Sequence, residues 1–315
     1  MVRTATAPAE LRTIPAAPGG PALDSGRVPW RRRLKAALSR VSGGYELRRP
    51  PNAGPTRRRR RGARSGERLL EAPVFVLCSV RSGSTLLRVL LDSHSQICAP
   101  HELHLRDVSV KVRGRYAERS LAEVDMEPKL LEYLLWDRLL HRELVASGKP
   151  VLVNKTPSDV LIVDRIRECW PDARFLFLLR HPLAIARSRQ RARPQDAPER
   201  NHAMVLRYVQ AVEDARQRLP GLTVRYEDLA TDPAAETRRI CAFLGLRWEA
   251  EMLDYGRFDH GRFRAGLGDW SENIRSGRVR PPSAPPPPEA VPPDLRPIAA
   301  AWGYVPLDAQ QTLLP

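Results

Sequence analysis

Residues 73–91 read PVFVLCSVRSGSTLLRVLL, and this stretch decides the fold. The run 73–79 is short and apolar and is bounded by Pro73 and a polar turn, as is typical of a strand buried on both faces of a parallel sheet. A Ser/Gly turn separates it from 86–91, where the apolar positions favour a buried helix. A strand, a polar turn and a helix in this order predict an anion-binding loop, because successive backbone N–H groups and the helix dipole favour negative charge there.

Short apolar runs alternate with helical patterns along the rest of the chain. Further strands are expected at 151–153, 174–179 and 221–226, and helices at 157–170, 182–190, 199–218 and 232–245. The stretch 101–150 is mainly helical in pattern, and we expect its leucines to pack in the core: Leu130, Leu131, Leu134, Leu135, Leu139 and Leu140. The alternation predicts an α/β three-layer sandwich with a mostly parallel sheet, whose ligands lie beyond the carboxyl ends of the strands.

The basic character of the chain lies mostly at its N-terminus. Residues 1–70 hold sixteen arginines and one lysine against four acids, in a chain of 315 residues with net charge +16. Proline and arginine without apolar periodicity predict a disordered basic leader over 1–71, followed by a single domain over 72–309 with a proline-rich loop at 281–293. A weak contact of the leader with an anionic surface stays open, whereas nucleic-acid binding is not expected.

Several absences bound the cellular setting. The four cysteines form no C-x-x-C pair, which predicts buried free thiols in a reducing compartment. No transmembrane helix and no signal peptide are expected, so we predict a cytoplasmic protein. The chain has no H-E-x-x-H motif or clustered Cys/His ligands, so no metal is expected. The arginine-, alanine- and proline-rich composition favours a bacterial source.

The loop differs from the Walker A loop of ATP-binding proteins, G-x-x-x-x-G-K-[ST]. Ser84 stands at the position of the Walker lysine, and Cys78 at that of its first glycine. A cation stands instead at Arg81. Gly83 allows the backbone to approach a phosphate closely, and Ser84 and Thr85 can cap the helix and donate hydroxyls. The loop therefore predicts phosphate binding without the kinase cation, with a nucleotide-dependent kinase as the alternative.

Two further strand ends carry cations. Arg180 opens RHPLAIARS after the strand 174–179, and Ser188 follows eight positions later, about two helical turns on. Both can therefore reach one phosphate, which Arg can bind through two hydrogen bonds. Lys155, in VNKTP, follows the strand 151–153 and is placed to meet an anion at the same edge of the sheet.

At this point the sequence resembles a known family. Residues 79–102, SVRSGSTLLRVLLDSHSQICAPHE, resemble the 5′-phosphosulfate loop of sulfotransferases that use 3′-phosphoadenosine 5′-phosphosulfate, most closely in the tyrosylprotein and bacterial branches. The chain departs from the family pattern at Val80 and Ser95, which replace prolines, and at His181, which replaces an acid. The resemblance spans about residues 73–304 and implies the P-loop-like sulfotransferase fold.

The resemblance also implies residue roles. Donor-binding residues would be Arg81, Ser82, Gly83, Ser84, Thr85, Arg180, Ser188, Tyr226 and Arg278. Catalytic residues would be Lys155, Arg81 and Glu102, which lies twenty-one residues after Arg81 and would be the base. His101 and His104 flank Glu102 and remain alternative bases, because histidine titrates near neutral pH. Tyr226 would lie near the adenine or be a buried strand residue, and the segment 268–274 with Arg278 would close over the 3′-phosphate.

The implied activity is transfer of a sulfuryl group from 3′-phosphoadenosine 5′-phosphosulfate to an acceptor hydroxyl, without a metal. A small molecule or glycolipid is the expected acceptor, and a peptide tyrosine is the alternative. Residues 103–150 and 189–205 are expected to line the acceptor pocket, because loops of this kind vary without changing the fold.

Overall fold

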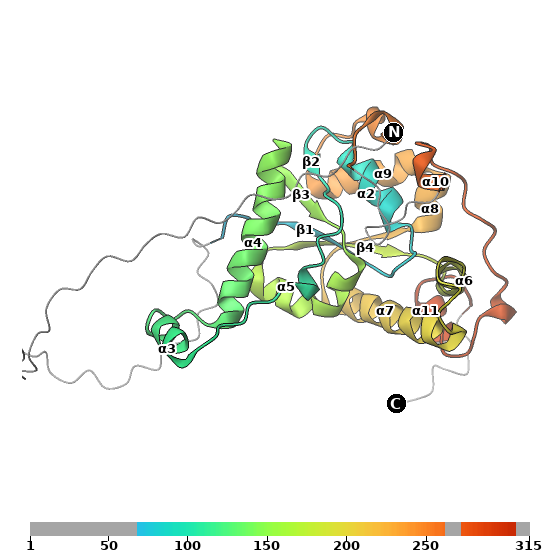
Figure 1. The fold of residues 1–315 in the computed structure, drawn as a ribbon. Coiled ribbons are helices and arrows are strands. Elements are labelled where there is room, and N and C mark those ends of the chain that lie inside the picture. The colour runs from blue at the N-terminus through green and yellow to red at the C-terminus, as the bar shows by residue number, and fades with distance from the viewer. Residues whose placement is uncertain (1–67, 262–271, 307–315) are drawn as a thin grey trace, which may run out of the picture. The chain divides into compact units, whose positions relative to one another are not determined.

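The computed structural model describes residues 68–261 and 272–306. Within them, five strands form one sheet in the order β2-β3-β1-β4-β5, and every neighbouring pair is parallel (Figure 1). The strands are β1 Val74–Cys78, β2 Ile97–Cys98, β3 Val151–Asn154, β4 Arg174–Leu179 and β5 Leu222–Arg225. The short edge strand β2 is the one strand that the sequence pattern does not predict.

Helices connect the strands as a parallel sheet requires. The α-helices are α2 Ser84–Asp92, α3 Arg115–Glu123, α4 Pro128–Ser147, α5 Val163–Cys169, α6 Pro182–Ala192, α7 Pro198–Arg218, α8 Tyr226–Thr231, α9 Pro233–Leu244, α10 Glu272–Arg275 and α11 Arg296–Ala301. Short 3₁₀ segments are η1 Leu105–Asp107, η2 Pro157–Ile162, η3 Ala250–Leu253, η4 Tyr255–Arg257 and η5 Pro288–Ala290.

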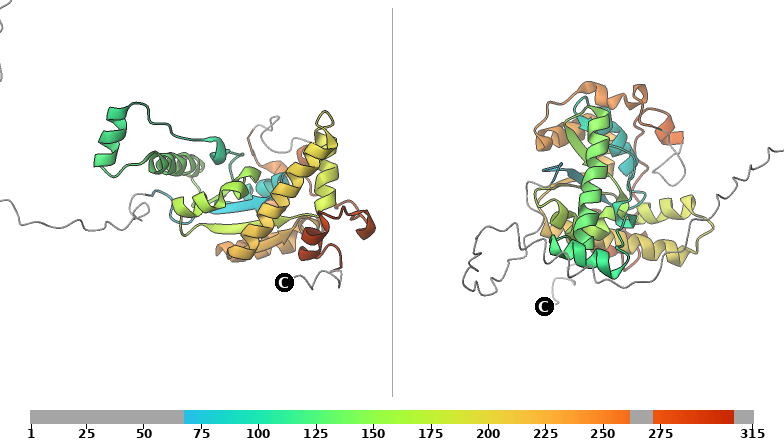
Figure 2. Two further views of the ribbon diagram at one scale, coloured as in Figure 1. Left: turned by 90° about the horizontal axis from the view of Figure 1, so that it is seen from below. Right: turned by 60° about the vertical axis from the view of Figure 1, so that its left-hand side comes forward.

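The alternation of side chains along β1 divides the core into two layers. Phe75 and Leu77 pack in a cluster with residues of α4, α5, α7 and α11, whereas Val74, Val76 and Cys78 pack with residues of α2, α8 and α9. All five β1 side chains are buried, as the uniformly apolar run predicts. Figure 2 shows α7 and α9 on opposite sides of the sheet. The three-layer α/β fold predicted from the sequence is therefore confirmed.

Local signals set several helix ends where they are expected. Asp232 caps α9, its side chain accepting a hydrogen bond from the N–H of Ala235 at 2.9 Å, and Pro233 occupies the first turn. Gly245 ends the same helix with a left-handed φ of 74°. The helix that begins at Pro182 is confirmed as well, with the imidazole of His181 accepting from the N–H of Leu183.

The helix α4 buries a different face from the one that its leucines predict. Its buried residues are Glu132, Tyr133, Trp136, Asp137 and Leu140. Of the six leucines expected in the core, Leu140 alone is fully buried, and Leu135 is 44% exposed. The aromatic rings offer more apolar area than the leucines do. Asp137 is held inside because it accepts hydrogen bonds from the N–H of Leu69 at 2.7 Å and the indole of Trp170 at 2.9 Å.

Two other expected elements have different boundaries. The helix predicted over 157–170 begins as the 3₁₀ segment η2, where the N–H of Asp159 donates to the carbonyl of Thr156, and becomes α-helical at Val163. The strand predicted over 221–226 ends at Arg225, so Tyr226 is the first residue of α8.

The four cysteines, Cys78, Cys98, Cys169 and Cys241, are buried and unpaired, as expected. No helix within 68–261 and 272–306 combines the length and apolar character needed to cross a membrane. The predicted leader over 1–71 lies almost entirely outside the described residues.

Candidate active site

The carboxyl ends of four adjacent strands supply the predicted site residues. Arg81 follows β1, Lys155 follows β3, Arg180 follows β4 and Tyr226 follows β5. Because β3, β1, β4 and β5 are neighbours and parallel, these residues emerge along one edge of the sheet. The topology therefore brings together motifs that lie up to about 145 positions apart in the sequence.

The loop after β1 has a strained backbone. Arg81 adopts a φ of 61° and Gly83 a φ of 87°, both in the left-handed region. Gly83 is the N-cap residue of α2, so this position has no side chain with which to cap the helix. Ser84 and Thr85 are predicted to cap the helix, but the structure places them inside its first turn, where both are buried. Their hydroxyls therefore remain at the amino end of the helix, although as part of its first turn.

Tyr226 packs directly against the loop glycine. A Cβ atom at position 83 would overlap Cδ2 of the Tyr226 ring, so both φ and space require glycine there. On the ring of Tyr226 lies the guanidinium of Arg180, 4.2 Å from the ring centroid. Tyr226, the first residue of α8, therefore packs against the loop that follows β1, a role that the sequence does not reveal.

The structure places Arg81 close to both Arg180 and Ser188. Nε of Arg81 donates to Oγ of Ser188 at 3.3 Å, across 107 positions of sequence. Arg180 donates through a terminal nitrogen to the carbonyl of Arg81 at 3.0 Å. Burial lowers the pKa of Arg180, but a guanidinium stays charged in proteins. Two arginines thus stand at one corner of the loop.

Lys155 and Glu102 form a buried ion pair. Nζ of Lys155 donates to Oε1 of Glu102, with side-chain exposures of 1% and 9%. The loop that carries Glu102 is held to the lysine segment by Thr156, whose hydroxyl accepts from the N–H of Leu103 at 3.2 Å. Thr156 is a residue that sequence reasoning missed, although its place beside Lys155 in VNKTP is a usable signal.

The two histidines beside Glu102 occupy different positions. His101 is exposed, and its Nδ1 lies 3.2 Å from the main-chain oxygen of Glu102 rather than from its carboxylate. His104 faces the carboxylate, with Nε2 3.6 Å from Oε2. Of the two alternative bases, His104 therefore faces the Glu102 carboxylate, whereas His101 faces the main chain.

Asp159 is a second buried carboxyl group near Lys155 that sequence reasoning missed. It is 1% exposed and accepts a hydrogen bond from the amide of Asn154 at 2.6 Å. Burial and the negative charge of Glu102 raise the pKa of Asp159 well above its ordinary value. Asp159 is therefore neutral over a wider pH range than an exposed aspartate.

Burial also raises the pKa of the Cys78 thiol to about 11, so this cysteine at the end of β1 is protonated and unreactive at neutral pH.

Several buried polar atoms around the loop have no partner within the described residues. They are Oγ of Ser79, Oγ of Ser82 and Nε of Arg180. Buried polar atoms without partners are uncommon in folded proteins and often mark a binding site. Hydroxyl and guanidinium donors of this kind suit the oxygens of a phosphate or sulfate.

Glu227 ties the strand ends to the C-terminal segment. Its carboxylate accepts from the N–H of His181 at 3.1 Å and from the hydroxyl of Tyr304 at 2.5 Å. Burial lowers the pKa of His181, which keeps its imidazole neutral. The neutral imidazole replaces the acid of the family pattern and serves as the helix cap described above.

The remaining predictions for the site have different outcomes. Arg278 is exposed, and its carbonyl oxygen accepts a hydrogen bond from the hydroxyl of Tyr255 at 3.1 Å. The segment 268–271 lies outside the described residues. Within the described part of the chain, no three His, Cys, Asp or Glu side chains group as a metal site would require. The absence of a metal remains a prediction.

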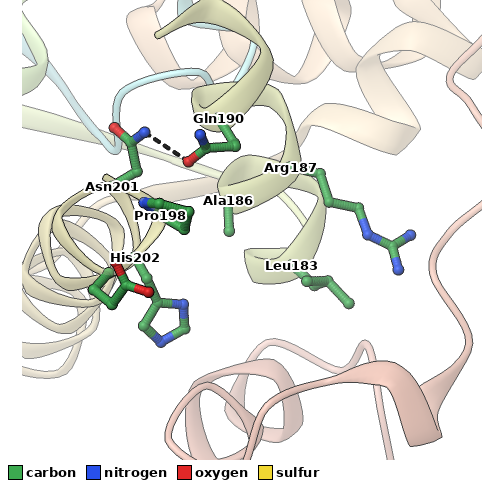
Figure 3. A pocket seen from close by; sticks show the side chains of 8 residues that line it. Leu183, Ala186, Arg187, Gln190, Pro198, Asn201 and His202 are labelled. Atoms are coloured by element: carbon green, nitrogen blue, oxygen red, sulfur yellow. Dashed lines mark hydrogen bonds between the residues drawn. The ribbon is translucent and has the colours of Figure 1, made fainter. Parts of the chain in front are cut away.

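A surface pocket of about 450 Å³ lies between α6 and α7 (Figure 3). It is lined by Leu183, Ala186, Arg187, Gln190, Pro198, Glu199, Asn201 and His202. Among the lining residues, Asn201 of α7 donates to the side-chain oxygen of Gln190 of α6 at 2.7 Å (Figure 3). None of the predicted site residues lines this pocket, although Gln190 and 198–202 belong to the stretch expected to contact the acceptor.

Comparisons with known proteins identify the family. A family model described as "Sulfotransferase family" matches residues 73–250, more than half of the 315-residue chain. The nodulation protein NoeE of Sinorhizobium fredii is 33% identical over 126 residues, which cover 36% of this chain and 30% of that protein. The protein-tyrosine sulfotransferase of Drosophila melanogaster is 27% identical over 213 residues, covering 60% and 41%. The matches thus span less than half the length of these two curated relatives.

Solved structures agree at the level of the fold. The sulfotransferase domain from the curacin biosynthetic pathway superimposes with a TM-score of 0.54 at 23% identity, covering 75% of this chain and 99% of that domain. The sulfotransferase domain of the Synechococcus PCC 7002 olefin synthase gives 0.51 at 24% identity, covering 77% and 92%. The matched family region begins at β1 and contains the loop, the buried Lys155–Glu102 pair and the Arg180–Ser188 corner, and by this match the chain belongs to the sulfotransferase family.

Proposed function

We propose that this sulfotransferase moves a sulfuryl group from 3′-phosphoadenosine 5′-phosphosulfate to an acceptor hydroxyl. The observation that carries the proposal is the buried pair of Lys155 and Glu102 beside the loop. A buried cation and a carboxylate in contact are the two groups that such a transfer needs, one for the leaving oxygen and one for the proton.

The loop corner supports a donor with two anionic groups. The amino end of α2 with Ser82, Gly83, Ser84 and Thr85 suits the phosphosulfate. Ser79, Ser82 and Arg180 each have a buried donor atom without a partner in the described part of the chain, and these donors suit anionic oxygens. Arg180, Arg81 and Ser188 suit a second phosphate at the 3′ position. The donor itself supplies the activated sulfuryl group.

Lys155 and Glu102 then divide the chemistry. Lys155 stabilises the negative charge that develops on the leaving phosphate oxygen, which is worth ~3–4 kcal/mol for a well-aimed donor. Glu102 accepts the proton of the attacking hydroxyl, which contributes ~10²–10⁴-fold. Arg81, from the strained loop, adds positive charge on the side of Ser188.

The acceptor that we propose is a small molecule or a glycolipid. The rival is a peptide tyrosine, which the name of the Drosophila relative favours. We further propose that residues 72–309 suffice for the reaction, without the basic leader.

Release of labelled sulfate from the donor tests the proposal. We expect the purified chain to release or transfer the label, and to do so equally after deletion of residues 1–71. A screen of cell extracts and of tyrosine peptides for a mass gain of one sulfuryl group then separates the two acceptor classes. Label that never leaves the donor, or turnover of Mg-ATP in its place, would refute the proposed function.

A further inference from the structure

Glu102 contacts two ionisable side chains through different oxygens. Oε1 accepts from Lys155, and Oε2 faces Nε2 of His104 at 3.6 Å. The contact with Lys155 fixes the position of the carboxylate, whereas His104 faces the other carboxylate oxygen. A proton that reaches Glu102 therefore has one neighbouring imidazole to which it can move.

The backbone of His104 is held in an unfavourable conformation that makes this contact. Among the described residues, three non-glycine residues have positive φ: Arg81, His104 and Asp125. Such conformations cost ~1–3 kcal/mol and cluster at functional sites. His104 adopts a φ of 48°, and the N–H of Asp107 donates to its carbonyl at 2.9 Å. The fully buried Leu105 anchors the same turn.

His104 is also the exposed member of the ionisable side chains around the Glu102 carboxylate. Four other elements contribute an ionisable group that interacts with Glu102: Lys155 after β3, Arg88 from α2, Asp159 from η2 and Cys78 from β1. All four of these are at most 5% exposed. The side chain of His104 is 39% exposed, so among the described groups facing Glu102 it is the one that reaches solvent.

We propose that His104 relays the acceptor proton from Glu102 to solvent, an inference that rests on the proposed function. As the acceptor oxygen bonds to sulfur and the bond from sulfur to the phosphate oxygen breaks, the acceptor O–H proton passes to the Glu102 carboxylate. Glu102 then gives this proton to Nε2 of neutral His104, and the imidazolium releases its Nδ1 proton to water. The 3.6 Å separation exceeds a direct hydrogen bond, so a bridging water or a small rotation of the ring completes the path.

Two substitutions of His104 and one of its neighbour test the relay. His104→Asn and His104→Gly both tolerate a positive φ, so they remove the imidazole without adding strain. His101→Asn is the matched control, because His101 is exposed and its Nδ1 faces the main-chain oxygen of Glu102 rather than the carboxylate. The readout is loss of the labelled sulfuryl group from 3′-phosphoadenosine 5′-phosphosulfate with the full chain. The label appears as sulfate when water is the acceptor, and as an aryl sulfate when the acceptor is phenol or a nitrophenol that is already ionised at mildly alkaline pH.

We expect both His104 variants to lose roughly tenfold or more in turnover with water and phenol, up to the ~10²–10⁴-fold range of proton-transfer catalysis. The loss should shrink as pH rises and as imidazole is added to the His104→Gly variant. It should be absent with the ionised nitrophenol, whose attack releases no proton. His101→Asn should follow the wild type with every acceptor.

The outcomes separate the relay from its alternatives. An equal loss with phenol and ionised nitrophenol, or no rescue by imidazole, overturns the relay in favour of a structural role. Wild-type turnover in both His104 variants overturns it as well. A wild-type chain that releases no sulfate to any acceptor refutes the proposed function, and the relay with it.

Discussion

Replacement of Lys155 by methionine should damage folding and catalysis together, and the structure gives the size of the folding effect. The side chains of Lys155 and Glu102 are 1% and 9% exposed, so Lys155→Met leaves a carboxylate buried without its partner. Breaking such a pair costs about 3–5 kcal/mol. For a domain of this size, each 1 kcal/mol lowers Tm by ~2–4 °C, so we expect a loss of about 10 °C.

The double substitution Lys155→Met with Glu102→Gln removes both charges and should recover most of that stability. Buried ion pairs replaced as a unit by groups of similar volume are often close to neutral in free energy of unfolding. Turnover should stay lost, because neither the leaving oxygen nor the attacking hydroxyl then has its partner. Stability and activity therefore diverge in the double variant, although they fall together in the single one.

The wild type, the two single variants Lys155→Met and Glu102→Gln, and the double variant form a double-mutant cycle. Urea denaturation of these four proteins gives the coupling free energy between Lys155 and Glu102, and sulfate release gives their turnover. Lys129→Met is the matched control: Lys129 pairs with Glu168, and both side chains are about half exposed, at 51% and 52%. Its loss should cost ~0–1 kcal/mol. A coupling free energy between Lys155 and Glu102 no larger than the ~0–1 kcal/mol expected of the exposed pair would contradict a buried ion pair between them. Wild-type turnover in a folded Lys155→Met chain would refute the role of Lys155.

Three further outcomes follow from the structure. Gly83→Ala should weaken binding of adenosine 3′,5′-bisphosphate in calorimetry, because a Cβ there overlaps the Tyr226 ring and φ is 87°; affinity equal to wild type would contradict this packing. Asp159→Asn should raise Tm relative to wild type, and by more as pH rises above the ordinary aspartate range. The pKa of Asp159 is raised in the folded state, so its stabilising contribution is complete at low pH and is lost as pH rises toward the folded-state pKa. A change in Tm that does not depend on pH would contradict the raised pKa. Trp136→Ala should cost about 3–5 kcal/mol of unfolding free energy, whereas Leu135→Ala costs little, and equal losses would mean that α4 buries the other face.

The sheet was predictable because its strands carry continuous apolar runs. In β1 and β4 nearly every side chain is buried, and a short apolar run between polar turns is typical of a strand buried on both faces of a parallel sheet. The helical spacing of the leucines in α4 did not predict its buried face, which is Glu132, Tyr133, Trp136, Asp137 and Leu140. The aromatic rings of Tyr133 and Trp136 decided the matter through contacts with distant elements, which no local pattern contains.

The sequence predicts which residues form the candidate site, and their roles stay predictions, but it does not predict their geometry. Lys155 and Arg180 were predicted as site residues because each directly follows a predicted strand, and parallel strands bring their carboxyl ends to one edge of the sheet. Neither the packing of Tyr226 on Gly83 nor the buried Asp159 could be read from spacing, because both depend on contacts made across the sheet and through η2. The positive φ of His104 is a tertiary effect of the same kind.

Burial of the Lys155–Glu102 pair changes what a loss of activity can mean. In a solvated site, a lysine substitution that abolishes turnover assigns a chemical role to the lysine, because the fold is indifferent to it. Here the same substitution leaves Glu102 charged in a place from which water is nearly excluded. The structure can respond by protonating Glu102, which removes the base, or by opening the loop that Thr156 holds, which displaces it. Both responses abolish turnover without any contribution of Lys155 to the leaving oxygen. The double variant removes the driving force for both responses, and so turnover measured there, in a chain of restored stability, is the measurement that assigns the chemistry to the pair.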